Sequence, residues 1–153
     1  MPLELAELFG YDAWANHRVL ESFQHPDTPS KALGLFAHIL AAQEIWLARL
    51  GGGDSSEIEV WPTRTLEDCE EAQHLLERTI EEYLRTVNKA SLDQPLEYRT
   101  TAGKSFQNTP RQILTHVAFH GQHHRGQIAA YMREAGATPA VTDLIAHYRE
   151  AQQ

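Results

Sequence analysis

The chain has 153 residues, which is enough for one domain with a full-sized core and too few for two. Its 13 Lys and Arg residues stand against 21 Asp and Glu, and the formal charge of −8 argues against nucleic acid as the main partner, because it repels phosphate backbones. Hydrophobic residues make up 42% of the chain, as in ordinary globular proteins, so disorder is not the expected state.

The composition also bears on location and cross-linking. No apolar run approaches the roughly 18 residues of a membrane span. The first residues lack a basic region followed by an apolar block, so no secretory signal is predicted. Cys69 is the single cysteine, which excludes an internal disulfide and a zinc site built from cysteines. We therefore expect one cytoplasmic domain over residues 1–153 that has no membrane partner.

The first third of the chain predicts two long helices. Apolar residues recur at helical spacing from about Leu3 to Phe23, and the segment HPDTPS then interrupts the pattern. Within that segment, Thr28 and Pro29 are typical of an N-cap and a first-turn proline, so a second helix is expected from there to about Leu50. The segment GGGDSS ends this helix and opens a long connection.

A third helix and a hairpin are expected next. Thr65 with Asp68 three residues later resembles a capping box, and a heptad-like apolar stripe from Cys69 to Val87 continues the helix. Between about Leu96 and Asn108, apolar and polar residues alternate around a turn that contains glycine. That alternation is the pattern of a small β-hairpin.

The last long helix has the clearest boundaries. Thr109 is the predicted N-cap, Pro110 is the first helical residue, and Gln112 closes a capping box. The helix runs to about Ala135, and a short C-terminal helix follows near residues 142–150. The expected fold is all-α: a four-helix bundle with a short C-terminal helix and a small hairpin, whose long connections permit a crossover.

Four histidines crowd into residues 116–124 of this last long helix. At about 100° per residue, His120 and His124 fall in the middle of its apolar face and project from it one turn apart. Two buried imidazoles without partners cost about 1–3 kcal/mol each. A divalent metal satisfies both, because neutral imidazole is a good ligand. Hydrogen-bonded core histidines are the alternative interpretation.

Among the other histidines, His38 is the best-placed third ligand. It lies in the middle of the second helix between apolar neighbours, although a structural role is the alternative for this residue too. Three histidines from two helices leave one position of a tetrahedral metal open, as in catalytic sites. The zinc-protease pattern His-Glu-x-x-His does not apply, because Gly121 stands where the glutamate would be, and the pattern names no general base.

Three more polar residues fall on or beside apolar helix faces. Asn16 lies at the centre of the apolar stripe of the first helix, and His116 and Gln127 lie toward one edge of the apolar face of the last long helix. Each of them either contacts the metal ligands and orients them, or forms hydrogen bonds that hold the core together.

Four segments resemble the DinB-like family of damage-inducible bacterial proteins: YDAWANHRVL at residues 11–20, HILAAQEIWLARL at 38–50, THVAFHGQHHRGQIAAYMREAG at 115–136 and TPAVTDLIAHYRE near the end. The resemblance implies a four-helix bundle that holds zinc or nickel on three histidines, which match His38, His120 and His124. It also implies relatives among metal-dependent hydrolases and thiol S-transferases that use small thiols, and frequent homodimers. It brings no matching catalytic acid or base.

Two functions are left open by these observations. In the first, an open metal position activates water or a low-molecular-weight thiol against a small-molecule substrate, as in a hydrolase or a thiol S-transferase. In the second, the protein is a non-catalytic, stress-induced metal-binding or interaction protein, whose metal staples the bundle. Nucleic-acid binding, which the family's name suggests, is disfavoured by the acidic charge.

Overall fold

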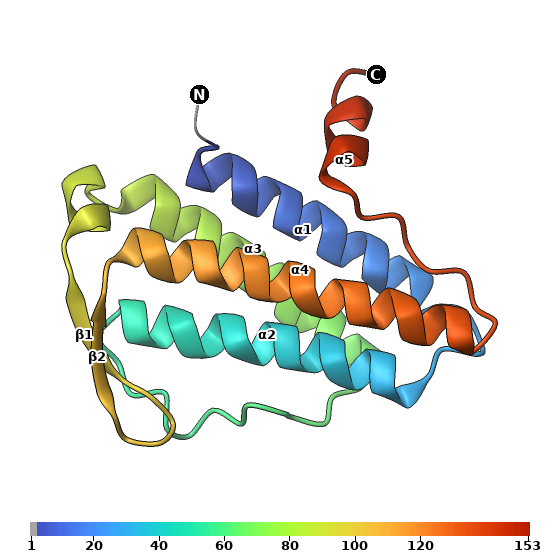
Figure 1. The fold of residues 1–153 in the computed structure, drawn as a ribbon, viewed down its shortest axis with the longest axis horizontal. Helices are drawn as coiled ribbons and strands as arrows, with labels where there is room; N and C mark the ends of the chain where they lie inside the picture. The colour runs from blue at the N-terminus through green and yellow to red at the C-terminus, as the bar shows by residue number, and fades with distance from the viewer. Residues whose placement is uncertain (1–2) are drawn as a thin grey trace.

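The computed structural model describes residues 3–153, in which four long helices form a bundle (Figure 1). Each of the helices α1 and α2 packs against both α3 and α4, so α1 and α2 lie on one diagonal of the bundle. Helices α2 and α3 run in the same direction, joined by a connection that passes along the length of the bundle. The predicted all-α bundle with a crossover is therefore confirmed. The helix bounds are α1 (Leu5–Ser22), α2 (Ser30–Leu50), α3 (Leu66–Thr86) and α4 (Pro110–Glu134).

Side-chain caps set the starts of α3 and α4, as the sequence predicts. The Thr65 hydroxyl accepts a hydrogen bond from the Asp68 N–H at 3.1 Å, and the Asp68 carboxylate accepts one from the Thr65 N–H at 3.0 Å. Thr109 and Gln112 form the same reciprocal pair at α4, with Pro110 as its first helical residue. Each cap satisfies backbone N–H groups that have no partner inside the helix, which typically contributes about 1 kcal/mol.

The predicted cap of α2 was wrong. This helix begins at Ser30, with Pro29 in the N-cap position and no side chain bonded to the first N–H groups. The Thr28 hydroxyl instead donates to the carbonyl oxygens of Phe23 and His25 at 3.2 and 2.8 Å. Thr28 therefore closes the turn that ends the preceding helix, and its side chain is not available to the next one.

The predicted hairpin is confirmed beside the ends of α2 and α4. Strands β1 (Leu96–Arg99) and β2 (Ser105–Asn108) pair antiparallel, with Leu96 opposite Asn108. Gly103 in the turn has a φ of 80°, which glycine adopts without steric cost. A 3₁₀ helix, η1 (Lys89–Asp93), precedes the hairpin and has no counterpart in the sequence prediction.

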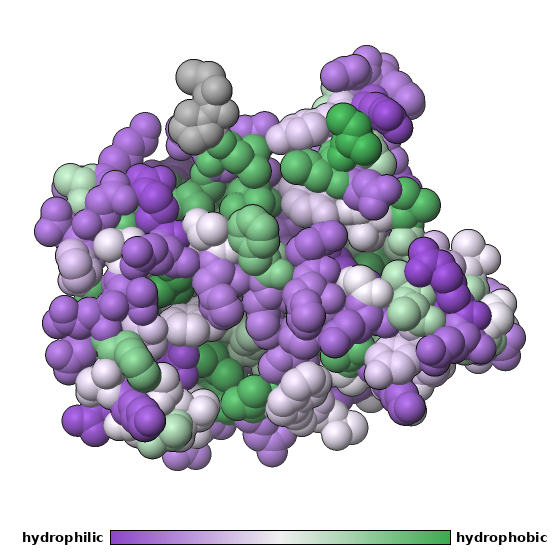
Figure 2. Space-filling model, in the orientation of Figure 1, coloured by the Kyte–Doolittle hydropathy of each residue, from purple (hydrophilic) through white to green (hydrophobic). Residues whose placement is uncertain are grey.

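Helix α5 (Leu144–Glu150) projects from the bundle beside α1 (Figure 1). The Trp14 indole donates to the Glu150 carboxylate at 2.9 Å, and the Tyr148 hydroxyl donates to Glu7 at 3.0 Å. Figure 2 shows hydrophobic side chains gathered over α1 and α5 on this face of the molecule. They border a groove between α1, α4 and α5, whose lining includes Leu3, Phe119 and Ile145.

The bundle core has two apolar clusters separated by a buried polar layer. In that layer, Arg125 of α4 donates to the Asp12 carboxylate at 2.7 Å and to the Asn16 side-chain oxygen at 2.8 Å. Gln43 donates to the other Asp12 oxygen at 2.9 Å. These bonds compensate the burial of a charged pair, which is costly when either charge lacks a partner.

Helix α2 is long and apolar enough to span a membrane. Half of its most apolar stretch is buried inside the bundle, as in the core helix of a globular domain. The sequence does not show this helix as a continuous apolar run, because His38, Gln43 and Glu44 interrupt it.

Candidate metal centre

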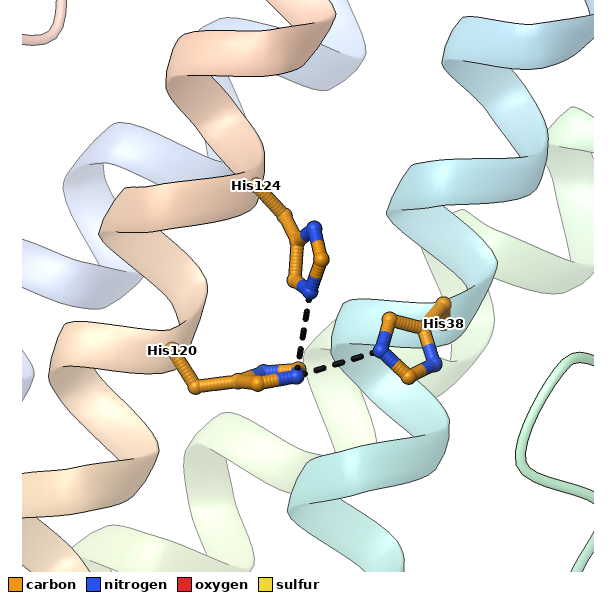
Figure 3. Close-up of side chains that lie close together, drawn as sticks. All are labelled: His38, His120 and His124. Atoms are coloured by element: carbon orange, nitrogen blue, oxygen red, sulfur yellow. Dashed lines mark hydrogen bonds between the residues drawn. The ribbon is translucent and has the colours of Figure 1, made fainter.

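Three histidines meet between α2 and α4 (Figure 3). His38 comes from the middle of α2, while His120 and His124 lie one turn apart on α4 and therefore share one face. The Nε2 atom of His120 lies 3.1 Å from Nε2 of His38 and 3.2 Å from Nε2 of His124. The structure thus brings together the three residues that the sequence singled out as candidate ligands.

Hydrogen bonds on the other ring nitrogens turn two of these Nε2 atoms inward. His38 Nδ1 lies 2.7 Å from the Val60 carbonyl oxygen, and His124 Nδ1 lies 2.7 Å from Gln127 Oε1. Both partners are acceptors, so each Nδ1 carries the proton and donates it. In the neutral rings, the Nε2 atoms of His38 and His124 therefore carry no proton, and the lone pair of each points toward His120.

This arrangement fits a metal ion better than a set of hydrogen bonds. The His120 Nε2 atom can offer one proton to two acceptors, so one of the three nitrogens is left unsatisfied when the rings are neutral. A tetrahedral ion with metal–nitrogen distances of about 2.0–2.1 Å holds neighbouring nitrogens about 3.3–3.4 Å apart. The observed separations of 3.1 and 3.2 Å are close to that value. Three neutral imidazoles are a donor set that zinc and nickel accept.

The environment of the triad keeps the rings of His38 and His120 uncharged at neutral pH. Burial, together with the smaller effect of the neighbouring histidines, lowers the pKa of His120 to about 4. Burial also lowers the pKa of His38, against the opposing effect of the bond to the Val60 carbonyl. Neutral imidazole is the form that binds metal, so the site is ready for an ion at pH 7 without first losing a proton from these two rings.

The connection between α2 and α3 covers one side of the triad. Its Trp61 ring stacks on the His38 ring with centroids 3.6 Å apart and planes 7° apart. Because this residue follows Val60 directly, one short segment both accepts the hydrogen bond from His38 and covers its ring. Sequence periodicity could not find this role, since it detects faces of helices and strands and not the path of a loop.

Known proteins provide an independent comparison. The family model described as DinB family matches residues 24–153. The chain belongs to the DinB family. The protein named Protein DinB from Bacillus subtilis (strain 168) is 28% identical to it over 161 residues, covering 90% of this chain and 89% of the relative. The matched range of the family model contains all three histidines of the triad.

The other polar residues predicted near the site of this DinB-family protein have different surroundings. Gln127 bonds His124, as described above. His116 is exposed, and its ring centroid lies 5.9 Å from that of His120 and 5.5 Å from that of Trp46. It therefore lies beside the triad, on the side of the hairpin, and does not join the three converging nitrogens.

Asn16 belongs to the buried polar layer of the bundle. Its side-chain amide donates to Gln73 at 2.9 Å, and its side-chain oxygen accepts from Arg125 at 2.8 Å. Both of its polar atoms are thus occupied by residues of α3 and α4 that are not part of the triad. These bonds favour the interpretation that Asn16 holds the bundle together, which was the alternative to a place beside the metal.

Proposed function

We propose that this DinB-family protein is a metal-dependent enzyme, which binds a divalent metal ion, zinc or nickel, through Nε2 of His38, His120 and His124. The observation that carries the proposal is the approach of three Nε2 atoms, two of which have their Nδ1 protons held elsewhere. Hydrogen bonds within the triad can satisfy only one of the two lone pairs that face His120, whereas a metal ion uses all three nitrogens.

An open coordination position supports a catalytic role. Among the residues that the structure describes, the cluster offers three nitrogen ligands and no carboxylate or thiolate as a fourth. Structural zinc sites usually have four protein ligands, whereas catalytic sites have three and leave a position for water or substrate. When bound, such an ion lowers the pKa of a coordinated water or thiol toward neutrality.

The protein's own residues then have three tasks. Val60 and Gln127 fix the orientation of two imidazoles through their Nδ1 protons. Trp61 shields the outer face of His38 from water. The lowered pKa values of His38 and His120 keep these rings as neutral ligands. We propose a metal-dependent hydrolase or a thiol S-transferase that acts on small molecules, with water or a low-molecular-weight thiol as the attacking group.

A non-catalytic role is the second candidate, and the position of the triad favours it. His38 comes from α2 while His120 and His124 come from α4, so an ion bound by all three would tie the two helices together. A metal-binding or interaction protein induced by stress would need no more than this. Removing the ion should then lower stability strongly without the loss of any activity.

An activity screen of variants distinguishes the two functions. Protein produced without a histidine tag and loaded with zinc or nickel is assayed on ester, amide and epoxide substrates, with and without a glutathione-like thiol. We expect a metal-dependent activity that is lost in His120→Ala and retained in His123→Ala, which removes an exposed histidine from the same helix. If the wild-type protein and His120→Ala have equal activity on every substrate, the proposal of an enzyme is refuted.

We further propose a cytoplasmic location and a small-molecule partner instead of a nucleic acid. The formal charge of −8 supports the second point, because it opposes binding to phosphate backbones. Duplex binding that is tight and falls steeply with salt would contradict it.

A further inference from the structure

We propose that the protein has a second divalent-metal site, formed by His17 of α1 with His74 and Glu77 of α3. Each of the three residues offers one ligand atom, and these atoms all lie within 4.8 Å of one another. His17 Nε2 lies 2.6 Å from Glu77 Oε2, and the ring centroids of His17 and His74 are 5.2 Å apart. This cluster shares no residue with the histidine triad, and it belongs to the α1–α3 pair of helices.

The spacing of His74 and Glu77 on α3 allows both side chains to bind the same ion as His17. His74 and Glu77 are separated by three positions, so their side chains leave the helix on one face. Because α1 packs against α3, that face meets His17. In the cores of other four-helix bundles a carboxylate and an imidazole three positions apart also hold metals, although in the opposite order, Glu-x-x-His. The helix pair therefore supplies two nitrogens and one oxygen.

The donor types indicate which ions fit. Imidazole suits zinc, nickel and copper, and two histidines with one glutamate is a known ligand set for zinc. Magnesium and calcium prefer sites built from oxygen alone. The bond between His17 and Glu77 satisfies those two groups without a metal, but it gives His74 no partner. A divalent cation uses all three, and the acidic charge of the chain favours its approach.

An ion can reach this cluster from solvent. The side chains of His17 and Glu77 are 35% and 27% exposed, and His74 is exposed. Glu77 also lines a cavity of about 240 Å³ between α1 and α3, together with the apolar side chains of Phe9 and Ile80. The cavity leaves room for water or a small ligand beside the carboxylate, so the ion would not need a fourth protein ligand.

Zinc titration separates this site from the triad. Metal-free protein without a histidine tag should bind two equivalents of Zn²⁺, and the His120→Ala/His124→Ala variant should still bind one. Adding either His74→Ala or Glu77→Gln to that variant should weaken the remaining binding by at least about ten-fold, since one of three ligands is lost. His74 is exposed, so its removal leaves the core intact. His25→Ala, in the turn after α1, is the matched control and should change neither affinity.

A crystal grown with Zn²⁺ gives the second measurement. We expect an anomalous scattering peak between His17, His74 and Glu77, and its loss in His74→Ala. The proposal is overturned if the triad variant binds no zinc and the wild-type crystal shows no peak there, because the cluster is then an ion pair with a neighbouring histidine. Zinc binding at the triad is tested separately, by comparing the number of zinc equivalents bound by the wild-type protein and by the triad variant.

Discussion

Replacing Gln127 tests whether the triad is oriented by the residues around it. Gln127 Oε1 accepts the Nδ1 proton of His124 at 2.7 Å and so fixes the tautomer that turns Nε2 toward the other two rings. In Gln127→Leu the side chain keeps a similar size but offers no acceptor, so His124 is free to change tautomer and to rotate. Loss of such a partner typically weakens metal binding about 10–100-fold, or about 1.4–2.7 kcal/mol. Gln127 is exposed, so the core should be unaffected.

The affinity is measured by competition with a chromophoric zinc chelator, in a His74→Ala background so that the triad alone is titrated. Gln127→Glu keeps an acceptor and should bind zinc at least as tightly as the parent protein. Gln107→Leu makes the same change on the exposed hairpin and should have no effect. Equal zinc affinity of Gln127→Leu and the parent protein, with both folded, would refute the reasoning that this hydrogen bond orients the ligand.

Three further predictions concern stability in the metal-free protein. Asp12→Ala should lower the free energy of unfolding by about 3–5 kcal/mol in urea denaturation, since it leaves the fully buried Arg125 charge without its carboxylate; a loss below about 1 kcal/mol would contradict this. The pKa of His120 is lowered from 6.5 to about 4, so between these values the unfolded chain binds more protons than the folded chain. The contribution of the neutral His120 ring to stability is therefore complete above pH 6.5 and is lost as the pH falls toward 4. The urea midpoint should therefore decrease between pH 7 and pH 5, and less so in His120→Ala; equal pH dependence would count against the burial of this ring. Thr109→Ala should cost about 1 kcal/mol by the same assay, with no change in zinc affinity.

The parts of the fold that depend on neighbouring residues in sequence could be predicted. Thr109, Pro110 and Gln112 mark the start of α4 because the capping box is made within four residues. His120 and His124 could be paired for the same reason, since an i, i+4 spacing on a helix fixes their common face. Thr28 shows the limit of this reasoning. Its hydroxyl donates to the carbonyl oxygens of Phe23 and His25, which are as near in sequence as the N–H groups of α2 that it was predicted to cap.

The parts that depend on distant residues could not be predicted in this way. Arg125 is fully buried because Asp12 and Asn16 on α1 accept its hydrogen bonds, and both lie more than 100 positions away in the chain. A charged residue on α4 gives no sign of those partners in the sequence. Trp61 and Val60 are similar, since their contacts with His38 follow from the path of a long connection across the bundle. For His38 itself, the place among apolar neighbours and the family resemblance indicate a ligand from the sequence.

A crystal structure of untagged protein with the metal it carries on purification tests the central claim most directly. We expect one ion bound to Nε2 of His38, His120 and His124 at about 2.0–2.1 Å, with a water or another non-protein ligand in the remaining position. Rings that bond only to one another and to Val60 and Gln127 in protein supplied with zinc and nickel would contradict it. The helical bundle would then remain as described, but the proposed metal site and its chemistry would be wrong.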